Sequence, residues 1–218
     1  MKLLSIQGRV LYEGDHQDGE EALFKASQLG LGLTELDWSG AYVEYLQAGT
    51  DLSSGSFCTA TFVKDLESIS FNYADLTGAE FSQIALTDCD FTGADVRGAE
   101  FASTIFLNTD LRLANLKPIK DDVFAILDTA HNEVRGLRQK LVDGQVEGWI
   151  YEGPCACLLG TIANLRRTNY TKLGWTPDGS RPAESWFWNI REGDKPDNNH
   201  IAEITLEWLD EYIALHNL

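Results

Sequence analysis

Hydrophobic residues recur with a period of five through the middle of the chain. Large apolar residues occupy eleven successive positions of this period: Leu66, Phe71, Leu76, Phe81, Leu86, Phe91, Val96, Phe101, Phe106, Leu111 and Leu116. A period of five winds an apolar stripe around an α-helix and sends successive side chains to opposite faces of a continuous strand. Neither element suits the pattern. It therefore predicts a chain that turns a corner every five residues and points its large residues into a common interior.

Small residues support this interpretation. The position two before each large residue holds mostly small or slim side chains, and Thr77-Gly78, Thr92-Gly93 and Arg97-Gly98 directly follow large residues. Glycine suits the tight backbone of a corner. Looser units precede the regular ones at residues 36–40 and 50–54, and the register slips by one residue at Leu66. We therefore expect irregular early coils and a bulge at residues 63–65.

The regular units resemble a known family. Ala74-Asp75-Leu76-Thr77-Gly78, Ala94-Asp95-Val96-Arg97-Gly98 and Ala114-Asn115-Leu116 are similar to the A-(D/N)-L-x-x units of pentapeptide-repeat proteins. The resemblance implies a right-handed, quadrilateral β-helix for residues 33–118. In that fold, the central residue of each unit and the residue two before it fill the interior.

The flanks are expected to cap this solenoid, because its open ends would expose apolar rungs and unpaired strand edges. Residues 1–32 predict a hairpin, with a strand at Arg9 to Tyr12, and a capping helix whose N-cap is Asp18. Residues 119–218 predict a mainly α-helical domain with an aromatic core, because five of the six Trp lie there. The fold class is therefore mixed.

Helical spacing in the C-terminal domain predicts three helices. The first runs from Asp121 and Asp122 to Asp143-Gly144, the second over residues 157–165 and the third over 201–215. The full layout, with motifs at residues 151–157 and 181–187, resembles pentapeptide-repeat proteins of bacteriophages and prophages. That resemblance attaches no biochemical function to the two motifs.

The charge balance narrows the classes of partner. The chain has 34 acidic and 17 basic residues, a net charge of −17 and a pI near 4.5. Such a surface disfavours direct binding of nucleic acid or of an anionic membrane and favours a basic protein partner. No signal peptide and no membrane span is predicted, and the four cysteines are too few for a disulfide scaffold. We expect a soluble cytoplasmic protein with reduced thiols.

The sequence holds no readable catalytic constellation. No nucleophile elbow, phosphate-binding loop or dinucleotide-binding fingerprint occurs, so we expect no enzyme activity and no cofactor. Cys155 and Cys157, together with His131, His200 or His216, could be assembled into a zinc site, but one intervening residue is too short a spacing between paired cysteines. Buried structural thiols and no metal are the favoured prediction.

Acidic residues precede the central position in most units of the solenoid. Residues twenty apart should stack on one face in successive coils, about 4.8 Å apart. This predicts three acidic columns, formed by the pairs Asp75 with Asp95, Glu80 with Glu100, and Asp90 with Asp110. A local alternative is that these carboxylates only satisfy backbone donors at the corners.

Two functions follow from these features. Residues 1–118 carry 18 acidic and 7 basic residues, so the solenoid would be a narrow acidic rod with the charge to imitate duplex DNA. Some pentapeptide-repeat proteins occupy the DNA-binding saddle of DNA gyrase, and the resemblance therefore implies a non-enzymatic inhibitor of a topoisomerase or a host defence nuclease. The alternative is a scaffold in which the helical domain binds the partner through its aromatic surface and the solenoid is a rigid spacer. Assembly as a homodimer stays open in both cases.

Overall fold

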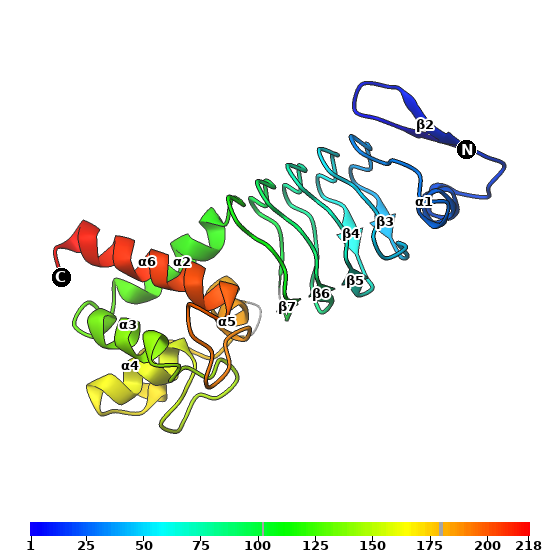
Figure 1. The fold of residues 1–218 in the computed structure, drawn as a ribbon. Coiled ribbons are helices and arrows are strands. Elements are labelled where there is room, and N and C mark those ends of the chain that lie inside the picture. The colour runs from blue at the N-terminus through cyan, green and yellow to red at the C-terminus, as the bar shows by residue number, and fades with distance from the viewer. Residues whose placement is uncertain (102, 179–180) are drawn as a thin grey trace. The chain divides into compact units, whose positions relative to one another are not determined.

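The computed structural model describes residues 1–101, 103–178 and 181–218. These residues form two compact units, Met1–Lys117 and Pro118–Leu218 (Figure 1). Stacked coils make up most of the first unit, and helices make up most of the second. The finer division at residue 32 stays a prediction.

The first unit begins with the predicted hairpin and helix. Strands β1 (Lys2–Leu4) and β2 (Val10–Glu13) pair antiparallel, and α1 spans Gly19–Gln28. Asp18 caps α1, because its Oδ1 accepts a hydrogen bond from the backbone N–H of Glu21 at 2.9 Å. The predicted N-cap is therefore confirmed.

The hairpin is joined to the edge of the first coil. Ser5 forms an antiparallel bridge with Leu36, and the N–H of Ile6 donates to the carbonyl of Glu35 at 2.8 Å. Leu3 is fully buried. The hairpin thus pairs with backbone groups that an uncapped solenoid would leave exposed.

Short parallel strands link successive coils into a β-helix solenoid. They are β3 (Tyr42–Val43), β4 (Thr61–Phe62), β5 (Leu66–Glu67), β6 (Ala85–Thr87) and β7 (Ile105–Leu107). Tyr42 pairs with Thr61, nineteen residues later, whereas Leu66 pairs with Leu86, twenty residues later. The step from Phe62 to Leu66 is four residues instead of five, and partners on either side of it, such as Thr61 and Glu80, lie nineteen residues apart, which confirms the predicted slip in register.

The predicted interior of the solenoid is confirmed. All eleven large residues of the five-residue period are buried, and Phe106 is the most exposed at 8%. Phe62, Phe81 and Phe101 form a stack with centroid separations of 4.6 and 5.2 Å. Each large side chain buried in this way contributes about 1.5–3 kcal/mol.

Left-handed backbone marks the corners, two residues after each large residue from Leu66 to Leu111 and after Leu52 and Phe57. Gly78, Gly93 and Gly98 have φ between 68° and 69° there, as the corner glycines predict. Non-glycine residues hold the same conformation at Ser54, Thr59, Ser68, Tyr73, Gln83, Asp88, Ser103, Asn108 and Leu113. The corner is thus imposed by the coil, and glycine only adopts it at lower cost.

The second unit contains five α-helices and one 3₁₀ turn among its described residues. They are α2 (Lys117–Leu127), α3 (Val134–Val142), α4 (Leu158–Arg166), η1 (Tyr170–Lys172), α5 (Pro182–Phe187) and α6 (His200–His216). Across the parts of both units that the structure describes, no helix is long and apolar enough to cross a membrane.

The prediction of one helix from Asp121 to Asp143 is wrong. Helix α2 already begins at Lys117, where Pro118 suits a first helical turn. It ends at Leu127, where the carbonyl of Ile126 accepts from the N–H of Thr129 at 3.0 Å and from the Thr129 hydroxyl at 2.8 Å. Residues 128–133 then separate α2 from α3.

The aromatic core predicted for the second unit is present. Trp186 and Trp208 stack with centroids 5.0 Å apart, and the indole N–H of Trp186 donates to Thr205 Oγ1 at 2.8 Å. Both indoles are buried, at 1% and 7% exposed. This pair joins α5 to α6 and anchors the interior.

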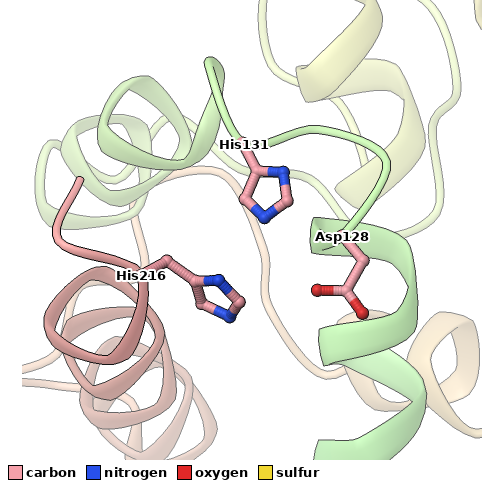
Figure 2. A group of neighbouring side chains, drawn as sticks. All are labelled: Asp128, His131 and His216. Atoms are coloured by element: carbon pink, nitrogen blue, oxygen red, sulfur yellow. The ribbon is translucent and has the colours of Figure 1, made fainter.

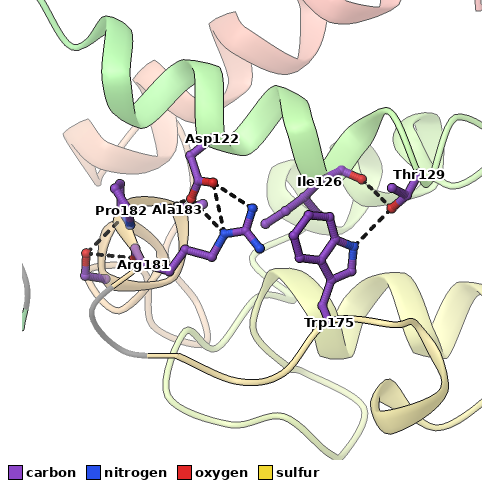
Figure 3. Close-up of polar contacts among 8 residues, drawn as sticks. Asp122, Ile126, Thr129, Trp175, Arg181, Pro182 and Ala183 are labelled. Atoms are coloured by element: carbon purple, nitrogen blue, oxygen red, sulfur yellow. Dashed lines mark hydrogen bonds and ion pairs between the residues drawn. The ribbon is translucent and has the colours of Figure 1, made fainter.

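A polar network fixes the segment before α5 onto α2 (Figure 3). Arg181 donates to Asp122 through Nε at 2.9 Å and Nη2 at 2.6 Å, and the N–H of Ala183 donates to the same carboxylate at 2.9 Å. The guanidinium carbon lies 3.9 Å from the ring centroid of Trp175. The motif at residues 181–187 therefore has a structural role.

Candidate functional site

The structure pairs each acidic residue of the predicted columns with its partner one coil away. Parallel bridges join Asp75 to Asp95, Glu80 to Glu100 and Asp90 to Asp110. Bridged strands lie about 4.8 Å apart, so each pair presents two carboxylates at that backbone spacing. We call these three pairs the acidic columns.

The aspartates of the columns also close local turns. Asp75 Oδ1 accepts a hydrogen bond from the N–H of Thr77 at 3.0 Å, and Asp90 Oδ1 accepts one from Thr92 at 2.9 Å. The same bond, from the residue two positions later, forms at Asp95 and Asp110. These carboxylates therefore satisfy backbone donors, as the local alternative states. A carboxylate that accepts such a hydrogen bond keeps its negative charge.

Two arginines offset part of that charge. Arg97 donates to the Asp95 carboxylate through Nε at 2.9 Å and Nη2 at 2.7 Å. Arg112 donates to Asp110 in the same bidentate way. Sequence reasoning missed both pairs, although the D-x-R spacing was there to be read. The columns are therefore less negative at Asp95 and Asp110 than the count of acids suggests.

The pKa values of two column residues lie below their usual range. A hydrogen bond from Arg97 lowers the pKa of Asp95 more than partial burial raises it. At Asp75, burial is the largest single effect and raises the pKa. Hydrogen bonds from Thr77 and Cys58 and the charge of Arg97 together lower the pKa by more than burial raises it. Both carboxylates are therefore ionised at neutral pH.

The most negative stretch of the solenoid lies between two basic residues, Lys64 and Arg97. Residues 65–96 contain seven acidic residues and no Lys or Arg. Glu80 and Glu100 are exposed. The coil that carries Asp75, Glu80 and Asp90 therefore has acidic residues and no Lys or Arg of its own.

The cysteines divide into buried and accessible thiols. Cys89 and Cys157 are 1% and 4% exposed, and burial raises the pKa of each to about 11. The prediction of a buried thiol is wrong for Cys155, whose side chain is half-buried and donates to Glu192 Oε1 at 3.2 Å. The two thiols therefore differ in exposure, although only one residue separates them.

The histidines considered for zinc lie apart from these thiols. His200 contacts Glu203, whereas His131 and His216 lie beside Asp128. Within residues 1–101, 103–178 and 181–218, these last three side chains form the group suited to holding a metal ion. Sequence reasoning missed Asp128, although its i, i+3 spacing to His131 was visible.

Comparisons with known proteins find similarity in the repeat region. Residues 79–117 match the pentapeptide-repeat family in eight copies. No curated protein matches the chain. Among solved structures, HetL from the cyanobacterium Nostoc, a pentapeptide-repeat protein involved in the regulation of heterocyst differentiation, is 23% identical, with a TM-score of 0.22 over 39% of this chain and 45% of HetL.

Two further solved structures are similar to part of this chain. A pentapeptide-repeat protein of the Arabidopsis thaliana thylakoid lumen is 23% identical, with a TM-score of 0.22 over 48% of this chain and 71% of its own. QnrB1, a plasmid-mediated fluoroquinolone resistance protein, is 26% identical, with a TM-score of 0.18 over 37% of this chain and 51% of its own. The period of five and the buried central residues agree with the family match, so residues 79–117 carry pentapeptide repeats.

Proposed function

We propose that this chain is a non-enzymatic binding protein whose acidic solenoid occupies the DNA-binding surface of a basic protein. A topoisomerase such as DNA gyrase or a host defence nuclease is the class of target. The observation that supports the proposal is the stacking of the acidic columns, most of whose residues lie within residues 65–96, a segment without Lys or Arg. A phage or prophage source fits such an inhibitor and rests on the resemblance in layout.

The density of charge supports the proposal. Duplex DNA carries one negative charge per about 1.7 Å of its axis, or about three charges per 4.8 Å. The coil that contains Asp75, Glu80 and Asp90 carries one carboxylate in each of the three columns over about the same rise. A groove lined with Lys and Arg would therefore meet similar charge on this coil and on DNA.

A flat-sided rod is part of the same proposal. We infer that the solenoid is right-handed and four-sided, since corners recur every five residues and backbone partners lie twenty residues apart. Four flat faces would let three adjacent columns contact one groove together. A cytoplasmic location is also proposed, because the four free cysteines suit a reducing compartment.

One observation favours the alternative scaffold function. Trp149 is 42% exposed and stacks on Trp188 with centroids 4.4 Å apart, and the Arg191 guanidinium lies 5.2 Å from the Trp149 centroid. Exposed Trp and Arg are typical of binding hot spots. In this alternative the aromatic pair binds the partner and the solenoid is a spacer.

Capture from a bacterial lysate with elution by short duplex DNA tests the proposal. The test variant carries Asp75→Asn, Asp90→Asn, Asp95→Asn and Asp110→Asn, which preserve the turn-closing oxygen and remove four charges. The control variant removes four exposed charges from the other unit by Asp143→Asn, Asp197→Asn, Glu207→Gln and Glu211→Gln. Both variants have the same net charge, so the comparison isolates the columns.

We expect duplex DNA to release the captured protein from the wild-type chain and from the control variant. The column variant should retain much less of it, because it lacks the charges that imitate phosphates. Equal retention by both variants, with no release by DNA, would exclude the acidic columns as the binding surface. Loss of binding in Trp149→Ala instead would favour the scaffold function.

A further inference from the structure

Three potential metal ligands meet at one end of two helices in the second unit (Figure 2). Asp128 directly follows α2, His131 lies in the loop between α2 and α3, and His216 is the last residue of α6. One ligand atom from each of these three side chains lies within 4.8 Å of those of the other two. The fold thus brings together residues up to 88 positions apart in the sequence.

The side chain of Tyr212 contacts all three of these residues. Its ring is fully buried, stacks on His216 with centroids 4.2 Å apart and lies 5.7 Å from His131. Its hydroxyl donates to Asp128 Oδ1 at 2.8 Å. A hydrogen bond to one carboxylate oxygen orients the group and allows the other oxygen to bind an ion, as outer-shell partners do in metal sites.

The electrostatic setting favours a cation. Helices α2 and α6 both end at this cluster, and the C-terminal end of a helix carries a partial negative charge. Asp128 adds a full negative charge. Arg135 donates to the backbone carbonyl of Leu218 and thereby holds the segment that follows His216.

The chemical type of the three ligand atoms determines which class of metal ion the site favours. Two imidazole nitrogens and one carboxylate oxygen suit Zn²⁺ and related transition ions, whereas Ca²⁺ and Mg²⁺ take oxygen ligands. Tetrahedral zinc with bonds of about 2.0–2.1 Å places its ligand atoms roughly 3.4 Å apart. All three side chains are exposed, so small rotations can close the present separation.

We propose that Asp128, His131 and His216 bind one Zn²⁺ ion, with water as the fourth ligand. The ion ties the end of α6 to the loop between α2 and α3, which are otherwise joined at this point by side-chain packing on Tyr212. The site is independent of the acidic columns. Cys155 and Cys157 take no part in it.

Calorimetric titration of the EDTA-treated full chain with zinc chloride tests the site. We expect one equivalent of zinc to bind, with at least tenfold weaker affinity in His131→Ala, His216→Ala and Asp128→Asn. The controls are His200→Ala and Cys155→Ser, which remove a histidine and a thiol elsewhere and should bind zinc like the wild type. Because the three ligands are exposed, circular dichroism of the metal-free variants should match that of the wild type.

Co²⁺ gives an independent readout. The cobalt-loaded chain should show visible d–d absorption without the near-ultraviolet thiolate band, and His216→Ala should lose this absorption. An excess of Ca²⁺ should leave the signal unchanged. Absence of saturable zinc binding, unchanged affinity in His131→Ala and His216→Ala, loss of binding in Cys155→Ser, or displacement by Ca²⁺ would each overturn the proposal.

Discussion

The two units of this chain are stabilised in different ways. In the solenoid, each coil contacts only its neighbours, and one interior position is repeated as Phe62, Phe81 and Phe101. In the helical unit, single contacts between distant segments hold the structure, such as Arg181 with Asp122 and Trp186 with Trp208. The solenoid therefore repeats one kind of contact along its length, whereas the helical unit adds contacts that each occur once.

The largest effect is expected from a charge placed inside the solenoid. Phe91 is fully buried, so Phe91→Asp would put an unpaired carboxylate among stacked rings and destabilise the unit by roughly 4 kcal/mol or more. Chemical denaturation followed by circular dichroism measures this. Ser82→Ala, on an outward position, should unfold like the wild type. Similar losses at both positions would show that the interior is wrongly assigned.

A smaller loss is expected from a polar contact in the helical unit. Arg181→Met removes the bidentate partner of Asp122, whose side chain is 19% exposed, and should cost about 2 kcal/mol in the free energy of unfolding of this unit. Arg138→Met is the matched control, because its pair with Asp210 is more exposed and should contribute about 0–1 kcal/mol. Equal effects would contradict the view that the more buried Arg181–Asp122 pair contributes more than the exposed Arg138–Asp210 pair.

A still smaller effect is expected at a corner of the coil. Gly98 has φ of 69°, and Gly98→Ala should destabilise the solenoid by about 1 kcal/mol through backbone strain alone. Gly32→Ala serves as the control, since nothing lies within 4 Å of a Cβ there and its φ is not left-handed. Thermal melting of both variants decides the point. A stabilised Gly98→Ala variant would show that the corner relaxes.

The thiols are expected to differ in reactivity without any change in stability. Burial holds the pKa of Cys89 and Cys157 at about 11, so both stay protonated as the pH rises from 7 to 9. The pKa of Cys58 and of Cys155 is also raised, so exposure decides the difference: N-ethylmaleimide should modify Cys58 and Cys155 in the folded chain and the other two only in denaturant, as mass spectrometry would show. Rapid labelling of Cys89 would indicate that the coils open locally.

Local and repeated features of the fold could be predicted from the sequence. The buried central residues, the glycine corners and the slip at Leu66 each follow from a few neighbouring residues, and the repeat presents the same evidence many times. The N-cap Asp18 was likewise visible in a single turn. Because the same pattern recurs in many units, one irregular unit does not obscure it.

Features that depend on distant segments could not be predicted. Two short local features were also missed, since residues 128–133 interrupt the helix expected there and the six residues of α5 carry too short a pattern. The group of Asp128, His131 and His216 forms only when α6 folds back beside α2. The bidentate pairs of Arg97 and Arg112 are local, since the D-x-R spacing places each arginine beside its aspartate, and they were therefore within reach of the sequence.

The central claim is that negative charge on the solenoid drives binding, and adding charge tests it most directly. Arg97→Gln together with Arg112→Gln removes the two cations that offset Asp95 and Asp110. The affinity of the captured partner for this variant and for the wild type should be measured at several salt concentrations. The proposal predicts tighter binding by the variant and a steeper loss of affinity with salt. Unchanged or weaker binding, with the same salt dependence, would contradict it.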